Sequence, residues 1–416
     1  MPIIDPIYVG KDAIGQLLAY IDTHNLHRFA LVADTHTFPA LGERVAAALK
    51  AQGCDLTTIV LEGDHIHADE HQVVQVLIQA PLGECTFIAV GSGTITDITR
   101  FSSHRTGRSF IGMPTAPSVD GFTSIGAPII LAGVKTTLLC QAPLAVFADL
   151  DTLRQAPHRL IAAGYGDMIG KVTSLADWRL GSILWDEPYD VDIARRSQAA
   201  IESVEKYAES IGQASEEGVR ALMDGLIESG LCMLDFGTSR PASGAEHHAS
   251  HFWEMKRLKE GRETPLHGAQ VGYALTLVAE QYARIRSLSR SEVMDRLESA
   301  TLPGREAEIA RIRQGYGDLA DDIAKDHGAF LDLGEDDFEQ LKHRIADHWE
   351  DIQDVAAHVP PPEAIKASLD KAGTPTSWTA LKLDADEVQP GFEYGHYLRN
   401  RFTVLKLSRV LDVPLG

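Results

Sequence analysis

The segment Gly244–Met255, "GAEHHASHFWEM", combines three histidines with a glutamate and a tryptophan. His247 and His251 are four residues apart, so on a helix they would share one face. Imidazoles in this arrangement suit a metal site, and they also suit ordinary packing. The choice between these interpretations depends on which residues elsewhere in the chain can join them.

Two other segments with helical periodicity supply suitable partners. "GYGDMIGK" places Asp167 and Lys171 four residues apart, and "PLHGAQVGY" contributes His267. One carboxylate and two imidazoles that leave a position open form the ligand set of a catalytic divalent metal. Taken singly, Asp167 could form a solvated salt bridge with Lys171, and His267 could cap a helix.

A third histidine-rich segment, "GDHIHADEHQ", looks richer in ligands because it holds His65, His67 and His71 beside several acids. It falls where a predicted strand passes into a predicted helix, and acids there suit capping and the helix dipole. We therefore predict a solvated loop for this segment, whose acids are Asp64, Asp69 and Glu70.

Glycines mark a turn that suits a dinucleotide. "FIAVGSGTITDITR" predicts a buried strand that runs through Gly91, Ser92 and Gly93 into a helix, whose first turn carries Thr94 and Asp97. Such a turn lets a pyrophosphate approach the backbone, while free amides and the helix dipole hold its charge. The spacing differs from the usual dinucleotide fingerprint, so a tight loop without a ligand is an alternative.

Two further predicted strand ends carry polar residues. "LVADTHT" places Asp34 at the carboxyl end of a strand, where a carboxylate commonly binds ribose hydroxyls, and "MPTAPSVDGFTS" contributes Thr115, Ser118 and Asp120. Ligands of open α/β sheets bind at these ends. Helix capping and turn formation explain the same residue types without a ligand.

The elements that position these residues follow from the hydrophobic pattern. Strand-like runs alternate with helical patterns in the first part of the chain, which predicts a parallel sheet flanked by helices in a nucleotide-binding α/β domain over residues 1–151. "TTLLCQAPLAVFADL" predicts further strands and a hairpin. Helical periodicity then continues almost to the end, which predicts an all-α metal- and substrate-binding domain over residues 152–416.

Composition excludes several classes of partner. The 416-residue chain has a net charge of −21, which disfavours nucleic acid and anionic membranes. The first residues lack a targeting pattern and the apolar runs are too short to span a bilayer, so we expect a cytoplasmic protein. The four cysteines are scattered, which argues for packing rather than for disulfides or a thiolate metal site.

The motifs together resemble the sn-glycerol-1-phosphate dehydrogenases, a branch of the superfamily that includes iron-containing alcohol dehydrogenases, glycerol dehydrogenase and dehydroquinate synthase. The resemblance covers nearly the whole chain. It rests on "GSGTITDITR", "MPTAPSVDGFTS", "GYGDMIGK", "SRPASGAEHHASH", "LHGAQVGY" and "LRNRFTVLKL", in that order. The segment "SRPASGAEH" is the most specific to this branch.

The resemblance implies a dehydroquinate synthase-like fold, NAD or NADP in the cleft between the domains, and one divalent metal, which is zinc or alternatively nickel or iron. The metal ligands it implies are Asp167, His247 and His267. The cofactor contacts it implies are Asp34, Gly91, Ser92, Gly93, Thr94, Asp97, Thr115 and Ser118. The chain departs from the family pattern at Ser92, where a glycine is frequent, and at His248, where an apolar residue is usual.

The resemblance further implies reversible hydride transfer between the nicotinamide and dihydroxyacetone phosphate, which gives sn-glycerol 1-phosphate. Asp120 would contact substrate hydroxyls, and His251 or a water would supply the proton. Since the net charge is negative, local cations must meet the substrate phosphate, and Lys171 and "EMKRLKEGRETPLHG", with Lys256, Arg257, Lys259 and Arg262, supply them. Solvated surface charges are the alternative for these residues. A polyol dehydrogenase without phosphate preference and a catalytically silent cofactor-binding homologue are the alternatives, and the family implies a homo-oligomer.

Overall fold

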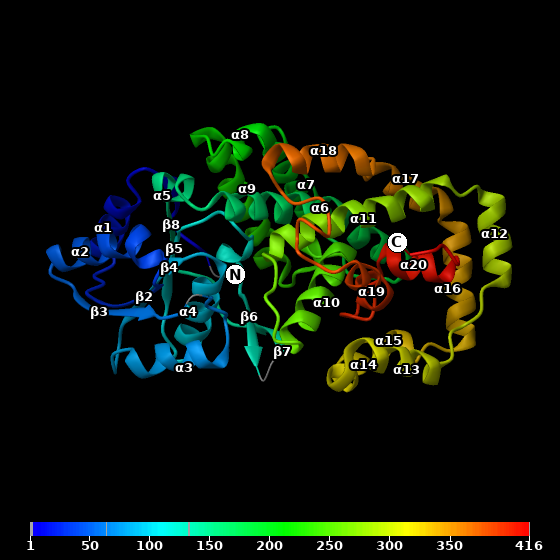
Figure 1. The fold of residues 1–416 in the computed structure, drawn as a ribbon, viewed down its shortest axis with the longest axis horizontal. Coiled ribbons are helices and arrows are strands. Elements are labelled where there is room, and N and C mark those ends of the chain that lie inside the picture. Colours follow the sequence, from blue (N-terminus) through cyan, green and yellow to red (C-terminus); the bar gives the residue numbers. More distant parts are fainter. Residues whose placement is uncertain (1–2, 64, 132–133, 416) are drawn as a thin grey trace. The chain divides into compact units, whose positions relative to one another are not determined.

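The chain forms two compact units (Figure 1). The structure is a computed structural model that describes residues 3–63, 65–131 and 134–415. The first unit comprises Met1–Met168 and Glu202–Gly237, and the second comprises Ile169–Ile201 and Thr238–Gly416. The first is an α/β unit, and the second is helical, as the sequence predicts.

The first unit is built on a parallel sheet of six strands among the described residues. Its strand order is β1-β8-β5-β4-β2-β3, and every adjacent pair is parallel. The strands are β1 (Ile7–Gly10), β2 (Arg28–Asp34), β3 (Asp55–Leu61), β4 (Thr86–Gly91), β5 (Phe110–Pro114) and β8 (Val146–Asp149). The predicted hairpin is also present, and consists of β6 (Gly126–Leu131) and β7 (Val134–Leu139).

Helices cover both faces of this sheet, which explains why its strands read as continuous apolar runs. In β2, Phe29 and Leu31 belong to the core that packs against α1 (Ala13–Thr23) and α2 (Glu43–Ala51). The alternate residues Ala30 and Val32 face the core formed with α3 and α4. These two helices are α3 (Glu70–Gln79) and α4 (Gly93–Arg105).

The first unit extends beyond residue 151, where the sequence predicts the nucleotide-binding domain to end. After α5 (Leu150–Arg154), helix α9 (Glu216–Phe236) returns to pack against α5 and β1, and Arg220 donates a hydrogen bond to the carbonyl oxygen of Val9 at 2.5 Å. Helical periodicity shows that α9 has an apolar face, but it does not show which core that face will join. This long-range packing therefore makes the unit discontinuous in the sequence.

Helices alone form the second unit among its described residues. The central helix α11 (His267–Ser287) packs against α10 (Ala245–Lys259), α17, α18 and α20. None of the described helices combines the length and apolarity needed to cross a membrane. The remaining helices that follow α5 are α6 (His158–Leu184), α7 (Val191–Glu205), α8 (Ala208–Gly212), α12 (Arg290–Ser299), α13 (Arg305–Tyr316), α14 (Ala320–Asp326), α15 (Gly328–Leu331), α16 (Glu335–Asp347), α17 (Trp349–His358), α18 (Pro362–Ala372), α19 (Ala385–Gly395) and α20 (Val404–Val410).

A close approach of backbones fixes the loop that follows β5. A Cβ atom added to Gly164 of α6 would lie 1.8 Å from the carbonyl oxygen of Pro117. The loop that carries Thr115 and Ser118 therefore packs directly against the backbone of α6, because Gly164 has no side chain at the point of contact.

We predict that Gly164→Ala lowers the free energy of unfolding by about 1–3 kcal/mol or more, because neither backbone can move away without breaking its own packing. Chemical denaturation measures the loss. Gly304→Ala is the control, since a Cβ atom there meets nothing within 4 Å and should change stability by no more than about 0.5 kcal/mol. Equal effects of the two substitutions would contradict the close approach.

Candidate metal centre and nucleotide site

Three helices bring the predicted metal ligands together. Asp167 lies on α6, His247 in the first turn of α10, and His267 at the first residue of α11. One ligand atom from each lies within 4.8 Å of the other two, and Asp167 and His247 are buried. The boundary between the units passes through α6 just after Asp167, and the next turn of this helix, at Gly170, packs against Val271 of α11.

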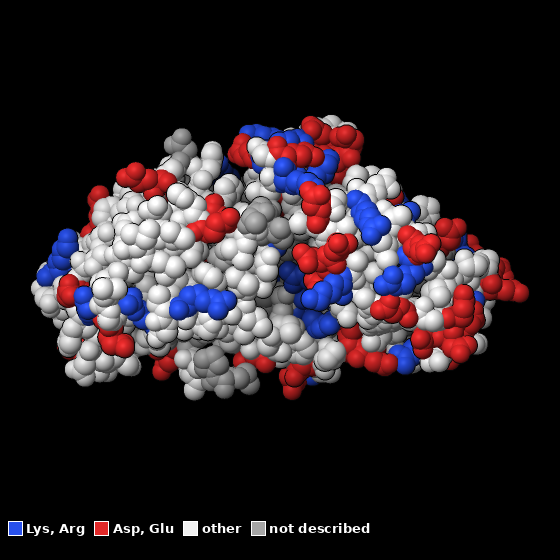
Figure 2. Space-filling view, turned by 90° about the horizontal axis from the view of Figure 1, so that it is seen from below, with Lys and Arg blue, Asp and Glu red and all other residues white. Residues whose placement is uncertain are grey.

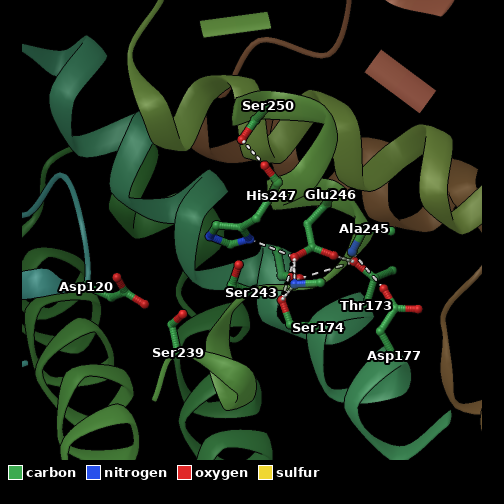
Figure 3. Close-up of polar contacts among 12 residues, drawn as sticks. Asp120, Thr173, Ser174, Asp177, Ser239, Ser243, Ala245, Glu246, His247 and Ser250 are labelled. Atoms are coloured by element: carbon green, nitrogen blue, oxygen red, sulfur yellow. Dashed lines mark hydrogen bonds and ion pairs between the residues drawn. The ribbon is translucent and has the colours of Figure 1, made fainter. Parts of the chain in front are cut away.

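Glu246 fixes the orientation of the His247 ring (Figure 3). Its Oε1 atom accepts hydrogen bonds from Nδ1 of His247 at 2.7 Å, the Gly244 amide at 2.8 Å and the Ser174 hydroxyl at 2.5 Å, while Oε2 accepts one from the Thr173 hydroxyl at 2.6 Å. Burial by itself would raise the pKa of Glu246, but the hydrogen bond and charge of His247, with the hydroxyls of Ser174 and Thr173, lower the pKa to about 2. The carboxylate therefore stays ionised and accepts the Nδ1 proton, which leaves Nε2 of His247 as the metal-binding atom.

Asp177 holds the start of α10 in place from the same helix, α6. Its Oδ2 atom accepts the Ala245 amide at 2.7 Å, and Oδ1 accepts the Tyr282 hydroxyl and the Val404 amide, both at 2.7 Å. Burial and the neighbouring Glu246 raise the pKa of Asp177 to about 7. Four segments of the second unit thus meet at one carboxyl group beside the His247 turn.

His251 lies beside the candidate metal ligands. Its ring stacks on that of His267 with the centroids 5.2 Å apart, and its Nδ1 atom lies 3.5 Å from Oε2 of Glu254. His251, Glu254 and His267 form a second group whose ligand atoms lie within 4.8 Å of one another. This placement suits a proton-carrying role beside the metal.

His248 is separate from both groups. It is fully buried, and neither ring nitrogen has a hydrogen-bond partner among the described residues. Burial lowers its pKa well below the usual value, and the cations of Arg401 and Lys406 lower it further. The helix turn therefore separates the adjacent histidines, with His247 at the candidate ligands and His248 in the packed interior.

Each of the four cations between the two ligand histidines pairs with a carboxylate of this chain. Buried Arg257 pairs with Glu387 at 2.8 Å. Lys256 pairs with Glu260, Lys259 with Asp318, and Arg262 with Asp384. Figure 2 shows the same pattern on one face of the second unit, where basic side chains alternate with acidic ones. Lys171 is fully buried on α6, one turn after Asp167.

The nucleotide-binding motifs lie at the carboxyl ends of adjacent strands in the first unit. Gly91 ends β4 and Asp34 ends β2, and the register pairs Val32 of β2 with Ala89 of β4. The strand order reverses between β2 and β4, which is where open α/β sheets bind ligands. Helix α4 begins at Gly93, directly beyond this point, so its amino end faces the same edge of the sheet.

Local packing accounts for part of the glycine pattern. A Cβ atom on Gly91 would lie 2.5 Å from Cβ of Ile95, and one on Gly93 would lie 2.8 Å from a methyl group of Val119. Ser92 precedes α4, and its hydroxyl hydrogen-bonds to that of Ser118, which ties the glycine turn to the loop after β5. The turn is thus shaped by its own chain, with Gly91 buried and Ser92 and Gly93 partly exposed.

The other predicted cofactor residues surround this turn. The Thr115 amide donates to the Gly91 carbonyl at 3.2 Å, and Thr94 is half-buried in the first turn of α4. Oδ1 of Asp34 accepts the amides of His36 and Thr37 at 2.8 and 2.7 Å. Asp34 therefore forms the turn after β2, a role the sequence leaves open as its alternative.

Arg100 is a residue that sequence reasoning missed. Its fully buried guanidinium donates to Oδ1 of Asp97 at 3.0 Å and to the carbonyls of Gly121, Phe122 and Gly126 at 2.6 to 3.1 Å. Burial raises the pKa of Asp97 to about 7, against the opposing effect of Arg100. The ion pair of Asp97 and Arg100 thus positions the loop after Asp120. The three-residue spacing of the two residues on a predicted helix is the feature of the sequence that indicates the pair.

Asp120 is anchored from two directions in the first unit. Its amide donates to Oδ2 of Asp167 at 3.1 Å, and its own Oδ2 accepts the Ser229 hydroxyl of α9 at 2.9 Å. The loop after β5 therefore contacts the candidate metal ligand through its backbone.

The histidine-rich segment before α3 has the predicted structural role. Asp69 caps α3 by accepting the Gln72 amide at 2.9 Å, and Glu70 lies in the first turn. His65, His67 and His71 belong to neither group of candidate metal ligands found among the described residues. Asp64 lies outside those residues.

Comparison with solved structures defines the class of the fold. A probable glycerol dehydrogenase from Sinorhizobium meliloti superposes with a TM-score of 0.63 at 16% identity, covering 98% of this chain and 96% of that one. A sulfoacetaldehyde reductase from Bifidobacterium kashiwanohense, solved in complex with NAD+, has a TM-score of 0.60. Residues 8–157 match the sequence model of the iron-containing alcohol dehydrogenases. The fold is that of the iron-containing alcohol dehydrogenase class.

Sequence relatives identify the family within this class. A glycerol-1-phosphate dehydrogenase (NAD(P)+) from Geobacillus thermodenitrificans is 38% identical over 97% of this chain and 91% of its own length. The enzyme of that name from Bacillus subtilis is 36% identical with the same coverage, and one from Halalkalibacterium halodurans is 47% identical over 67% of this chain and 71% of its own. The chain belongs to the glycerol-1-phosphate dehydrogenase family.

We predict that Glu246→Gln weakens metal binding about 10- to 100-fold, because the neutral amide no longer holds the Nδ1 proton of His247 by charge. Competition with a chelator measures the affinity. Glu387→Gln is the matched control: this glutamate is equally buried and pairs with Arg257, so its loss should lower stability and leave metal affinity unchanged. Unchanged metal affinity in Glu246→Gln would contradict the orienting role.

Proposed function

We propose that the protein catalyses the reversible, NAD(P)-dependent reduction of dihydroxyacetone phosphate to sn-glycerol 1-phosphate. The observation that carries this proposal is the convergence of Asp167, His247 and His267 in a chain that belongs to the glycerol-1-phosphate dehydrogenase family. Neither a silent cofactor-binding role nor packing alone requires a carboxylate and two imidazoles with one imidazole held in a fixed tautomer.

The donor set fits a divalent metal. Asp167, His247 and His267 would hold it, and the second hydrogen-bonding shell of His247 is already complete. When bound, the metal supplies Lewis acidity at the carbonyl oxygen, and the nicotinamide supplies the hydride. Carboxylate and imidazole ligands suit zinc, nickel and iron(II), and we propose zinc because tetrahedral sites with an open position are typical of it.

The side chains around the ligands have separate tasks. Glu246 orients His247, and His251 is placed to carry a proton to the substrate oxygen because its ring stacks on His267 and approaches Glu254. We propose that Asp120, anchored by Ser229, binds a substrate hydroxyl. Lys171 is buried one turn beyond Asp167 and supports the substrate site from within α6.

The nicotinamide cofactor is assigned to the first unit. The glycine turn from Gly91 to Gly93 and the amino end of α4 offer amides to the pyrophosphate. Asp34 lies at the neighbouring strand end, where its negative charge favours a ribose with free hydroxyls over one with a 2′-phosphate. We therefore propose NADH as the preferred reductant.

We predict that alanine at Asp167, His247 or His267 removes most bound metal and nearly all turnover, because each loss leaves two protein ligands. Metal analysis and a nicotinamide absorbance assay measure the two effects. His67→Ala is the control and should retain metal and activity, since His67 lies outside both candidate groups. A fully metal-loaded His267→Ala protein would overturn the ligand assignment.

We predict that kcat/KM for dihydroxyacetone phosphate exceeds that for dihydroxyacetone by about a hundredfold to ten-thousandfold. Two charge-assisted hydrogen bonds to a phosphate, at about 1.5 to 3 kcal/mol each, account for this range. Steady-state kinetics with both ketones measures the ratio. Equal specificity constants would leave a polyol dehydrogenase without phosphate preference.

A further inference from the structure

Three arginines gather around one serine in the second unit. Nη1 of Arg399 and Nη2 of Arg401 donate to the Ser239 hydroxyl oxygen at 2.7 and 2.9 Å. Nη1 of Arg401 also donates to the carbonyl oxygens of Ser239 and Ser243. Arg240 follows Ser239 in the chain and donates to the Asn400 carbonyl at 3.3 Å. The segments 239–243 and 399–401 therefore form one arginine cluster.

The arginine cluster holds one direct ion pair in the described part of the chain, between Arg240 and Glu187. Asp326 acts on Arg399, and Glu187 and Glu246 act on Arg401, only from beyond ion-pair distance. Burial lowers the pKa of Arg401 well below its usual value, and the cations of Arg399 and Arg240 lower it further. A buried cation whose counter-charges lie beyond ion-pair distance is costly, so Arg399 and Arg401 gain free energy when an anion binds.

The cluster also has hydrogen-bond donors to spare. A guanidinium has five N–H groups, and the side chain of Arg399 uses one of its Nη1 hydrogens on Ser239. The Ser243 hydroxyl is buried and lacks a partner in the described structure. The Ser239 oxygen accepts two hydrogen bonds, which leaves its own proton to donate. A guanidinium fork beside two hydroxyls matches the acceptor oxygens of a phosphate.

The backbone at Arg399 is consistent with a functional placement. Its φ angle is 61°, in the left-handed region that side chains other than glycine and asparagine rarely occupy. Strained conformations of this kind persist where the surroundings hold them, and they are frequent at ligand sites. Here the hydrogen bond to Ser239 holds the side chain on the cluster.

The cluster adjoins the candidate metal ligand in the sequence and in space. Ser243 lies one residue before Gly244, whose amide binds Glu246, the partner of His247. In Figure 3 the hydroxyl groups of Ser239 and Ser243 and the ring of His247 lie on the same side of the Glu246 hydrogen bonds. An anionic group bound by these hydroxyls would therefore belong to a molecule that reaches the metal ligands.

We propose that Arg399, Ser239 and Ser243 bind the phosphate group of the substrate, with Arg401 positioning the two serines. This assignment rests on the proposed function, and it replaces the cations at 256–262 that already pair with carboxylates. The remaining part of the substrate would extend from the arginine cluster towards His247.

Kinetics with the two ketones tests this assignment on the metal-loaded enzyme. Arg399→Asn removes the cation and keeps a residue that tolerates the left-handed region, and Ser243→Ala removes a hydroxyl without a partner. Each substitution should lower kcat/KM for dihydroxyacetone phosphate about 10- to 100-fold. The kcat/KM for dihydroxyacetone should stay within about threefold of the wild-type value. Lys259→Gln, which removes a surface cation paired with Asp318, is the control and should change neither.

Binding of inorganic phosphate gives a second readout that does not need turnover. Calorimetry should show phosphate binding to the wild-type protein and at least about tenfold weaker binding to Arg399→Asn. The protein could bind phosphate in an Arg399-dependent way and yet reduce neither ketone. That result would support the phosphate subsite and refute the proposed function. Rapid reduction of dihydroxyacetone phosphate that neither Arg399→Asn nor Ser243→Ala impairs would refute the subsite and leave the proposed function standing.

Discussion

The buried carboxylate of Glu246 is the interaction on which the candidate metal centre depends. It joins α6, through Thr173 and Ser174, to the start of α10 and to the ring of His247. An ionised carboxylate without partners would be expensive to bury, and four hydrogen bonds offset that cost. The same bonds that stabilise the charge therefore fix the metal-binding face of His247, so folding and ligand geometry are coupled.

Other buried charged groups in both units are likewise stabilised by several hydrogen bonds. Asp177 receives donors from α10, α11 and the first residue of α20, and Arg100 donates to carbonyls of the loop after Asp120. Each charge gathers backbone or side-chain groups from segments distant in the sequence. In the arginine cluster only Arg240 has a carboxylate within ion-pair distance among the described residues, which leaves Arg399 and Arg401 for an external anion.

Local patterns were sufficient to predict much of the fold. The alternation of apolar strands and helices indicated the parallel sheet, and the turn at Gly91 was placed correctly between β4 and α4. The tertiary partners of helices were beyond reach, because periodicity does not specify which core a helix joins. Helix α9 therefore packs with the first unit although it lies within the predicted helical domain.

In the candidate site, too, the residue types follow from the sequence, whereas the contacts depend on tertiary packing. The ligand residues could be chosen from their types and from the family resemblance, but the roles of Glu246 and Arg100 could not. The availability of a charge also depends on distant partners: Arg257 forms an ion pair with Glu387, 130 residues away, whereas Asp326 acts on Arg399 only from beyond ion-pair distance. Residue type alone therefore does not show whether a cation already pairs within the chain.

Direct location of the metal tests whether Asp167, His247 and His267 are its ligands. A crystal of the metal-loaded protein, with data collected on both sides of the absorption edge of the metal, would place it without reference to activity. We predict one anomalous peak at about 2.0–2.2 Å from a carboxylate oxygen of Asp167, Nε2 of His247 and a ring nitrogen of His267. A peak at His65, His67 and His71, or one that leaves His247 uncoordinated, would contradict it.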